Sequence, residues 1–363
     1  MRRYLSPTNL KQMFFKKLLA SVFGLLSIAT VAGAIFGLMG GGEISSLISS
    51  VIKTEPTNSL SGRVGSDGPI LVVKIDDTPA AHPQAGLEDA DIVYIEQVEG
   101  GLTRLAAIFS SKVPDVIGPV RSARISDIEL LEQFGRVIFA YSGAQSKLLP
   151  VIDQANLENV GAQRQGKDIY ANDPARIAPT AMMLQAKKLM EKVVGQTSST
   201  AISKPTGWNF GDAPDTGTAI ISAKVSWPAN SYQVTWSEPE KRWLLAHRDS
   251  PNLSASGVHL GATTFVIQLV SITPSEYHDK VGGVTPFSAT VGNGKGFILR
   301  DGLAIEALWN RETAASGTFW TLPSGEEILF APGQIWVALT DKEPEFTPVP
   351  ASNAADAPTR ASK

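Results

Sequence analysis

The stretch of residues 18–42 constrains this chain most, because it contains no charged side chain and is largely apolar. A helix of that length can cross the ~30 Å hydrocarbon core of a bilayer. Residues 1–17 before it carry basic side chains and no acidic one, and such a flank stays in the cytoplasm. We therefore predict a single N-terminal transmembrane helix. This places residues 43–363 outside the cytoplasm, in a single-pass protein of the cell membrane.

A cleaved signal peptide is the alternative interpretation of the same segment. Ala32, Gly33 and Ala34 have the small-x-small form of a cleavage site. The basic segment is long for a signal peptide, however, and the apolar run exceeds an ordinary signal-peptide core. We therefore favour an uncleaved anchor, and in both cases the working part of the chain is extracytoplasmic.

Composition excludes several classes of protein. The chain has 363 residues, of which 43% are hydrophobic and 18% charged, so two or three domains with buried cores are expected. A net charge of −3 argues against nucleic acid as a partner. The absence of cysteine excludes disulfides, thiolate metal sites, cysteine nucleophiles and a lipid anchor on cysteine.

The pattern beyond the apolar run predicts an α/β N-terminal domain. Residues 43–67 are rich in Ser, Gly and Thr and are expected to form a flexible linker. Within 68–205, strand-like and helix-like runs alternate, which is typical of an α/β domain. The predicted strands are 70–75, 92–95, 105–109 and 137–141, and the predicted helices are 126–134, 145–155 and 180–193.

Residues 215–342 predict a second, mostly β domain. Short strand-like runs are separated there by turn dipeptides such as Asn293-Gly294 and Asp301-Gly302, which are typical of hairpins. The tail of 343–363 is rich in Pro, Ala and Ser and is predicted to be disordered.

Charged residues gather between Asp76 and Arg124, and they define the predicted site. Two arginines, Arg121 and Arg124, follow the turn dipeptide Gly118-Pro119 just before a predicted helix. Guanidinium forks in such a place suit a carboxylate or phosphate. Alternatively, the arginines only pair with nearby acids and stabilise the fold. The predicted ligand-binding residues are Asp76, Asp77, Glu96, Glu99, Arg104, Arg121, Arg124 and Arg176.

Catalytic and metal signatures are weak. Glu96 and Glu99 could act as general acid and base, but strand alternation would place them on opposite faces. Asp76, Asp77 and Asp91 lack the spacing of a calcium-binding loop. The four histidines are too scattered in the sequence for a metal signature. We predict no metal and no cofactor.

The order of several motifs resembles the YerB-like family of bacterial envelope proteins, which is built on a domain of unknown function (DUF3048). The matching motifs lie at 73–77, 82–87, 90–94, 98–104, 117–124, 172–179, 291–296, 300–302, 308–311 and 332–336. This chain differs at His82, where the family usually has Arg, and at Thr180, where it usually has His. The resemblance implies an envelope location but no particular reaction.

Three functions follow as hypotheses. The first is a membrane-anchored binding or accessory protein that holds an anionic envelope ligand or a cell-wall-assembly partner in an Arg/acid cleft. The alternative is a hydrolase or transferase acting on cell-wall glycan or a phospho-linked glycopolymer, with Asp76 or Glu96 as acid/base. The third is a structural protein that recruits a membrane protein through its surface.

Overall fold

One sheet of sixteen strands runs through both halves of the chain. The structure is a computed structural model and describes residues 55–195 and 199–350. The strands of the first half are β1 (Leu71–Asp76), β2 (Ile92–Gln97), β3 (Thr103–Phe109), β4 (Val116–Ile117), β5 (Val137–Ala140), β6 (Leu157–Asn159), β7 (Tyr170–Asn172) and β8 (Met182–Gln185). Its helices are α3 (Ser126–Glu132), α4 (Leu149–Gln154) and α5 (Ala186–Val194), with 3₁₀ turns η1 (Pro79–Ala81), η2 (Leu87–Asp89), η3 (Glu99–Gly101) and η4 (Ala162–Arg164).

The second half consists of strands and their connecting turns. They are β9 (Thr218–Ser226), β10 (Ser231–Ser237), β11 (Arg242–His247), β12 (Ser250–Pro251), β13 (Gly261–Ala262), β14 (Thr264–Leu269), β15 (Ile272–His278), β16 (Val284–Ser288), β17 (Gly292–Arg300), β18 (Leu303–Arg311), β19 (Phe319–Thr321), β20 (Ile335–Thr340) and β21 (Glu345–Pro348). The main path of the large sheet has the order β12-β11-β10-β9-β18-β17-β14-β20-β2-β3-β1-β5-β6.

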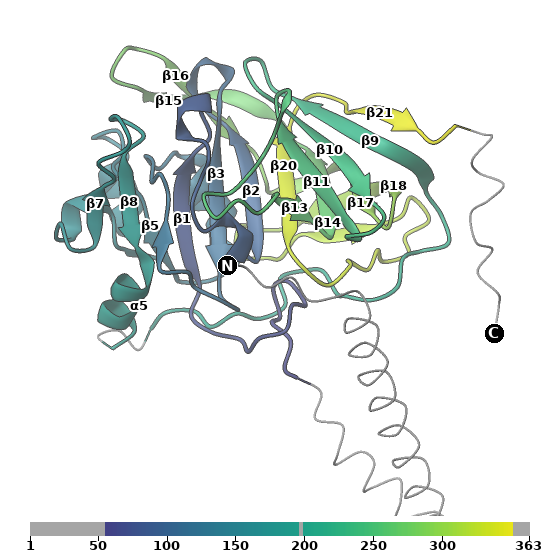
Figure 1. Ribbon diagram of the computed structural model, residues 1–363, viewed down its shortest axis with the longest axis horizontal. Coiled ribbons are helices and arrows are strands. Elements are labelled where there is room, and N and C mark those ends of the chain that lie inside the picture. The colour runs from purple at the N-terminus through teal and green to yellow at the C-terminus, as the bar shows by residue number, and fades with distance from the viewer. Residues whose placement is uncertain (1–54, 196–198, 351–363) are drawn as a thin grey trace, which may run out of the picture. The chain divides into compact units, whose positions relative to one another are not determined.

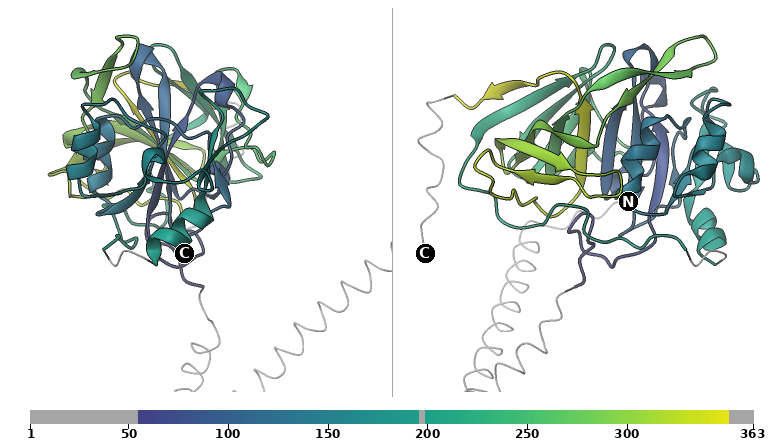
Figure 2. Two further views of the ribbon diagram at one scale, coloured as in Figure 1. Left: turned by 90° about the vertical axis from the view of Figure 1, so that its left-hand side faces the viewer. Right: turned by 180° about the vertical axis from the view of Figure 1, so that it is seen from behind.

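Strand β20 joins the two halves, although it comes near the end of the chain. It pairs in parallel with β14 on one side and with β2 on the other, so Ile335 lies opposite both Thr264 and Ile92. Figure 1 shows this yellow strand between the blue strands of the first half and the green strands of the second, and Figure 2 shows the same order from behind. The backbone hydrogen bonds of the two halves therefore form one continuous network.

The predicted fold class, an α/β domain plus a separate β domain behind a transmembrane helix, is wrong. The structure is mostly β, and α3, α4 and α5 contain only 7, 6 and 9 residues. Strands β1, β3 and β2 form near the predicted positions but pair antiparallel, without helical crossovers between them. Hydrophobic periodicity located many of the elements but could not reveal which strands become neighbours.

The transmembrane part of that prediction is not supported either. Among the residues that the structure describes, no helix is long and apolar enough to cross a bilayer. The predicted span, residues 18–42, and the predicted cytoplasmic segment, residues 1–17, lie outside the described residues.

Two apolar clusters cover the two faces of the sheet near β1, β2 and β3. Strand alternation places Val73 and Ile75 in one cluster and Ile70 and Val72 in the other. Trp336 of β20 is fully buried in the first cluster. Because both faces are covered, polar side chains on these strands are buried, including Asp76 at the end of β1.

Candidate functional site

The site residues lie where β1, β3 and β2 meet at one end of the sheet. The register places Asp76 of β1 opposite Arg104 of β3, which in turn lies opposite Glu96 of β2. These three side chains share one sheet face. Asp77 and Thr103, each one residue away, share the other face, where the Thr103 hydroxyl donates to Asp77 Oδ2 at 2.5 Å.

Arg121 and Arg124 reach the Asp76 face from the segment that leads into α3. Arg121 donates its backbone N–H to the carbonyl of Lys74, and its Nε lies 2.6 Å from Asp76 Oδ2. Arg124 donates Nε and Nη2 to Glu99 Oε2 at 2.9 and 2.7 Å. The predicted juxtaposition of these arginines with acids therefore forms, and both form ion pairs.

Glu99 joins the same cluster because β2 ends at Gln97. The following turn, η3, contains Gly100 and Gly101 with φ of 67° and 71°, a conformation that L side chains rarely adopt. Strand alternation therefore no longer governs Glu99, and its carboxylate turns toward Arg124. A Cβ at Gly101 would lie 2.5 Å from Pro228 Cβ, so the turn also packs closely on the second half.

Arg104 is the arginine of this cluster without a carboxylate partner. Its Nη1 donates to the carbonyl of Ser122 at 2.9 Å, and within residues 55–195 and 199–350 it forms no ion pair. Burial, together with the nearby charges of Arg124 and Arg121, lowers the pKa of Arg104 to about 9. The guanidinium is thus still mostly charged at neutral pH. Three guanidinium groups share two ion-paired carboxylates.

A second charged group is buried beneath this cluster. Lys74 Nζ lies 2.5 Å from Glu96 Oε1 and 2.8 Å from Asp127 Oδ1, and all three side chains are at most 1% exposed. Burial raises the pKa of Glu96 to about 7, with the negative charge of Asp127 adding to the effect and Lys74 opposing it. A substrate cannot reach Glu96 in this conformation, and Glu96 is paired with Lys74 rather than with Glu99.

Two predicted site residues lie elsewhere. Asp77 faces the opposite side of the sheet. Arg176 donates Nη1 to the carbonyl of Ala81 at 2.9 Å and Nη2 to that of Pro83, so it fastens the loop after β1. Asp91, considered with Asp76 and Asp77 for a cation, is instead buried among amides and hydroxyls of Ser61, Ser110 and Ser111.

Asp77 lies in a polar group that sequence spacing did not reveal. Its Oδ1 accepts from the hydroxyl of Tyr232 at 2.6 Å and lies 3.2 Å from His82 Nε2 and 3.9 Å from His247 Nε2. The two imidazole rings stack with centroids 4.2 Å apart. His82 follows β1 and His247 ends β11, so only the tertiary structure brings them together.

Burial controls the charges in this group. It lowers the pKa of His247 to about 4, so this imidazole is neutral at pH 7. Burial also acts on Asp77, but the neighbouring His82 and His247 and the hydrogen bond from Thr103 outweigh it and lower the pKa of that carboxyl. Asp77 is therefore ionised next to the neutral His247.

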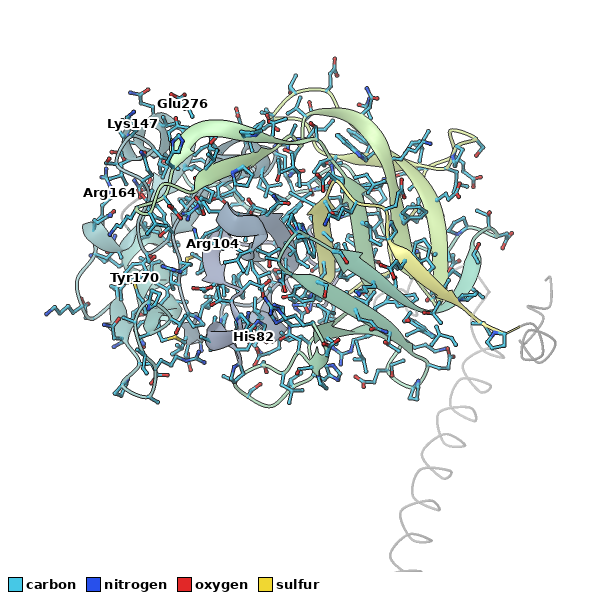
Figure 3. All side chains as sticks on the ribbon, turned by 90° about the horizontal axis from the view of Figure 1, so that it is seen from above. His82, Arg104, Lys147, Arg164, Tyr170 and Glu276 are labelled. Atoms are coloured by element: carbon cyan, nitrogen blue, oxygen red, sulfur yellow. The ribbon has the colours of Figure 1, made fainter. Side chains whose placement is uncertain are left out.

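The histidines open into a hollow of about 640 Å³. Its walls include His82, His247 and Ser254, with most other lining residues coming from the segment 248–257. Figure 3 labels both Arg104 and His82, and His82 lies nearer the lower edge of the molecule in that view. The two polar groups thus occupy opposite faces at the same end of β1.

Comparisons with known proteins match both halves of the chain to one family. Residues 57–199 match the N-terminal domain of a protein of unknown function (DUF3048), and residues 223–337 match the C-terminal domain of the same family. A Bacillus subtilis (strain 168) protein described as "Putative lipoprotein YerB" is 24% identical over 279 residues, which are 74% of this chain and 80% of the relative.

A solved structure supports the same fold. The crystal structure of the YerB protein from Bacillus subtilis aligns with a TM-score of 0.68 at 19% identity, over 80% of this chain and 99% of that one. The family resemblance drawn from the sequence motifs is thereby confirmed.

Proposed function

Because the chain belongs to the DUF3048 family of proteins of unknown function, we propose a function from its own geometry. The protein binds an anionic group of an envelope ligand through Arg104, Arg121 and Arg124. The Bacillus subtilis relative is described as a lipoprotein, and this likeness supports an envelope location for this chain as well. The ligand can be a cell-wall precursor or polymer, or an acidic segment of a cell-wall-assembly partner.

The charge balance of the arginine cluster carries this proposal. Asp76 and Glu99 each pair with one arginine, whereas Arg104 binds only a backbone carbonyl among the described residues. A buried guanidinium without an ion-pair partner of its own is costly, and an added phosphate or carboxylate would lower that cost. The arginine fork also matches the oxygen spacing of these two anions.

Arg121 is the most exposed arginine of the cluster, with a side chain that is 26% exposed. Arg124 and Arg104 are less exposed, so an incoming anion would meet Arg121 first and then lie against the inner guanidinium groups. Buried charge-assisted hydrogen bonds are worth more than those of a surface pair. This arrangement favours a compact anionic group over a diffuse charged surface.

Thermal unfolding of the full chain tests the proposal. The panel is inorganic pyrophosphate, a poly(glycerol phosphate) and a carboxylate-bearing peptidoglycan fragment, each matched in ionic strength with chloride. An anion at about 100 times its Kd should add about 2.7 kcal/mol of stability. Comparing the phosphate-bearing compounds with the carboxylate-bearing fragment shows which of the two anionic groups the protein binds.

Arg121→Ala is the test variant and Arg164→Ala the control. Arg164 also pairs with a carboxylate, that of Asp153, but the pair is exposed and lies outside the cluster. Stabilisation by an anion that disappears in Arg121→Ala and persists in Arg164→Ala supports the proposal. If no anion stabilises the wild type beyond chloride, or both variants lose the effect equally, the proposal is wrong.

A further inference from the structure

The face of the sheet opposite the arginine cluster holds a convergent set of metal-binding atoms. Asp77, His82 and His247 each offer one ligand atom, and the three atoms lie within 4.8 Å of one another. His82 comes from the loop after β1, and His247 from the end of β11. The two histidines therefore bring both halves of the chain to one carboxylate.

The hydrogen bond with Asn252 orients the ring of His82. His82 Nδ1 lies 3.1 Å from Asn252 Oδ1, an acceptor, so the proton of a neutral ring belongs on Nδ1. His82 Nε2 then carries a lone pair, 3.2 Å from Asp77 Oδ1, which is also an acceptor. The Gln84 amide nitrogen lies 3.3 Å from this ring nitrogen and 3.4 Å from Asp77 Oδ1, so it approaches the same two acceptors that a bound cation would join.

His247 supplies an independent observation. The residue is 6% exposed, and its Nε2 is buried without a hydrogen-bond partner. That nitrogen lies 3.9 Å from Asp77 Oδ1. A buried ring nitrogen without a hydrogen-bond partner is uncommon in folded proteins, and its position beside the Asp77 carboxylate suits a bound cation.

We propose that Asp77, His82 and His247 bind a first-row divalent transition metal ion, with Zn²⁺ the best match. Two imidazole nitrogens and one carboxylate oxygen form a donor set that Zn²⁺ prefers, whereas Ca²⁺ and Mg²⁺ prefer oxygen alone. Zn–N and Zn–O bonds of about 2.0–2.2 Å place tetrahedral ligand atoms a little over 3 Å apart. The present separations approach this spacing, and small side-chain rotations complete it.

The surrounding hydrogen bonds suit this role. Asn252 holds His82 as described above, and Tyr232 and Thr103 donate their hydroxyls to the two oxygens of Asp77. Such outer partners orient metal ligands and fix their protonation. Arg176 adds support from a distance, because it fastens the loop that carries His82 through Ala81 and Pro83.

Three protein ligands leave a fourth coordination position open. The hollow of about 640 Å³ lies beside both histidines, so a water molecule or a ligand from that side can occupy this position. Structural zinc sites use four protein ligands, whereas three with an open position are typical of sites that exchange a ligand. The metal therefore belongs to a binding site rather than to a purely structural one.

Metal binding by the full chain, stripped with EDTA, tests the proposal. The probes are Zn²⁺, measured by competition with a chromogenic chelator, and Co²⁺, measured by the visible absorption of its tetrahedral complex. We expect one ion per chain. His82→Gln and His247→Gln should each weaken Zn²⁺ binding by at least about tenfold.

His278→Gln is the matched control, because His278 is an exposed histidine on β15 outside this group. It should leave the Zn²⁺ affinity unchanged. Circular dichroism of each metal-free variant checks folding. If His247→Gln fails to fold, the Zn²⁺ affinity of His82→Gln tests the proposal. This variant is expected to fold, because His82 is a partly exposed loop residue.

Two results would overturn the assignment. In one, the wild type binds no Zn²⁺. In the other, His82→Gln and His278→Gln lower the affinity equally, which means that Zn²⁺ binds to surface histidines. The anion experiment is independent of both, because it uses the opposite face.

Discussion

Asp76 and Asp77 are neighbours in the chain, but their carboxylates serve different clusters on opposite faces of the sheet. Asp76 Oδ2 lies 2.6 Å from Arg121 Nε, whereas Asp77 Oδ1 accepts from the hydroxyl of Tyr232, also at 2.6 Å. The first carboxylate balances an arginine, and the second organises two histidines. Substitutions at these two positions should therefore separate the anion site from the metal site.

Asp76→Asn should strengthen anion binding. The variant removes the negative charge that competes with an incoming anion for Arg121. The guanidinium groups of the cluster then outnumber its carboxylates by a larger margin. We expect pyrophosphate to stabilise Asp76→Asn more than the wild type, with a steeper dependence on salt. The midpoint of thermal unfolding with and without pyrophosphate measures this. Weaker stabilisation in the variant would show that Asp76 positions Arg121 rather than competing for it.

Asp77→Asn should affect the metal site and not the anion site. It leaves the pyrophosphate effect unchanged, because its side chain points away from the arginines, and it weakens Zn²⁺ binding. Competition with a chelator and thermal unfolding of the same sample measure both effects. Loss of the pyrophosphate effect in a folded Asp77→Asn protein would contradict the separation of the two faces.

Glu96→Gln should flatten the pH dependence of stability. The pKa of Glu96 is raised from 4.5 to about 7 in the fold, so protonation of this buried carboxyl favours folding. The stabilisation is complete below pH ~4.5 and is lost as the pH rises through about 7. Glutamine mimics the protonated acid, and Lys74 keeps Asp127 at 2.8 Å as a partner.

Urea unfolding of both proteins between pH ~5 and ~8 measures this difference in pH dependence. Glu158→Gln is the control, because it removes a carboxylate from a partly exposed pair with Arg136. Its curve should remain parallel to that of the wild type. Parallel curves for Glu96→Gln as well would mean that Glu96 is ionised throughout this range.

Asp91→Ala should destabilise the fold more than Asp91→Asn. Asp91 Oδ2 accepts from the backbone amides of Ser110 and Ser111 at 2.7 and 2.8 Å, in a fully buried position. Alanine leaves both amides without an acceptor, at a cost of about 1–3 kcal/mol for each group. Asparagine retains one oxygen for the amides, while its NH₂ group can donate to a serine hydroxyl. Chemical denaturation compares the two variants, and equal losses would contradict this explanation.

Trp336→Ala should destabilise both halves of the chain together. Trp336 lies fully buried on β20, between β14 and β2, and large-to-small changes at such positions cost about 3–5 kcal/mol. Far-UV circular dichroism and tryptophan fluorescence should show one coincident unfolding transition in the wild type and in the variant. Two separated transitions would show that the halves unfold independently despite the shared sheet.

Patterns along the chain were enough to locate local elements and the chemical character of one cluster. Short apolar runs located β1, β2 and β3. The density of charge between Asp76 and Arg124 identified residues that do meet, because they lie on adjacent strands and on a segment paired with them. Local patterns of this kind are readable because they depend on near neighbours in the chain.

The fold class and the second cluster depend on contacts between segments that are far apart in the chain. The position of β20 between β2 and β14 depends on pairing between strands far apart in the sequence, and periodicity carries no information about such partners. His82 and His247 likewise meet only because β11 packs near the loop after β1. Even Glu99 changed face, because two glycines ended the strand alternation that its position would otherwise follow. Long-range packing sets these relationships, whereas local patterns along the chain set the elements that pack.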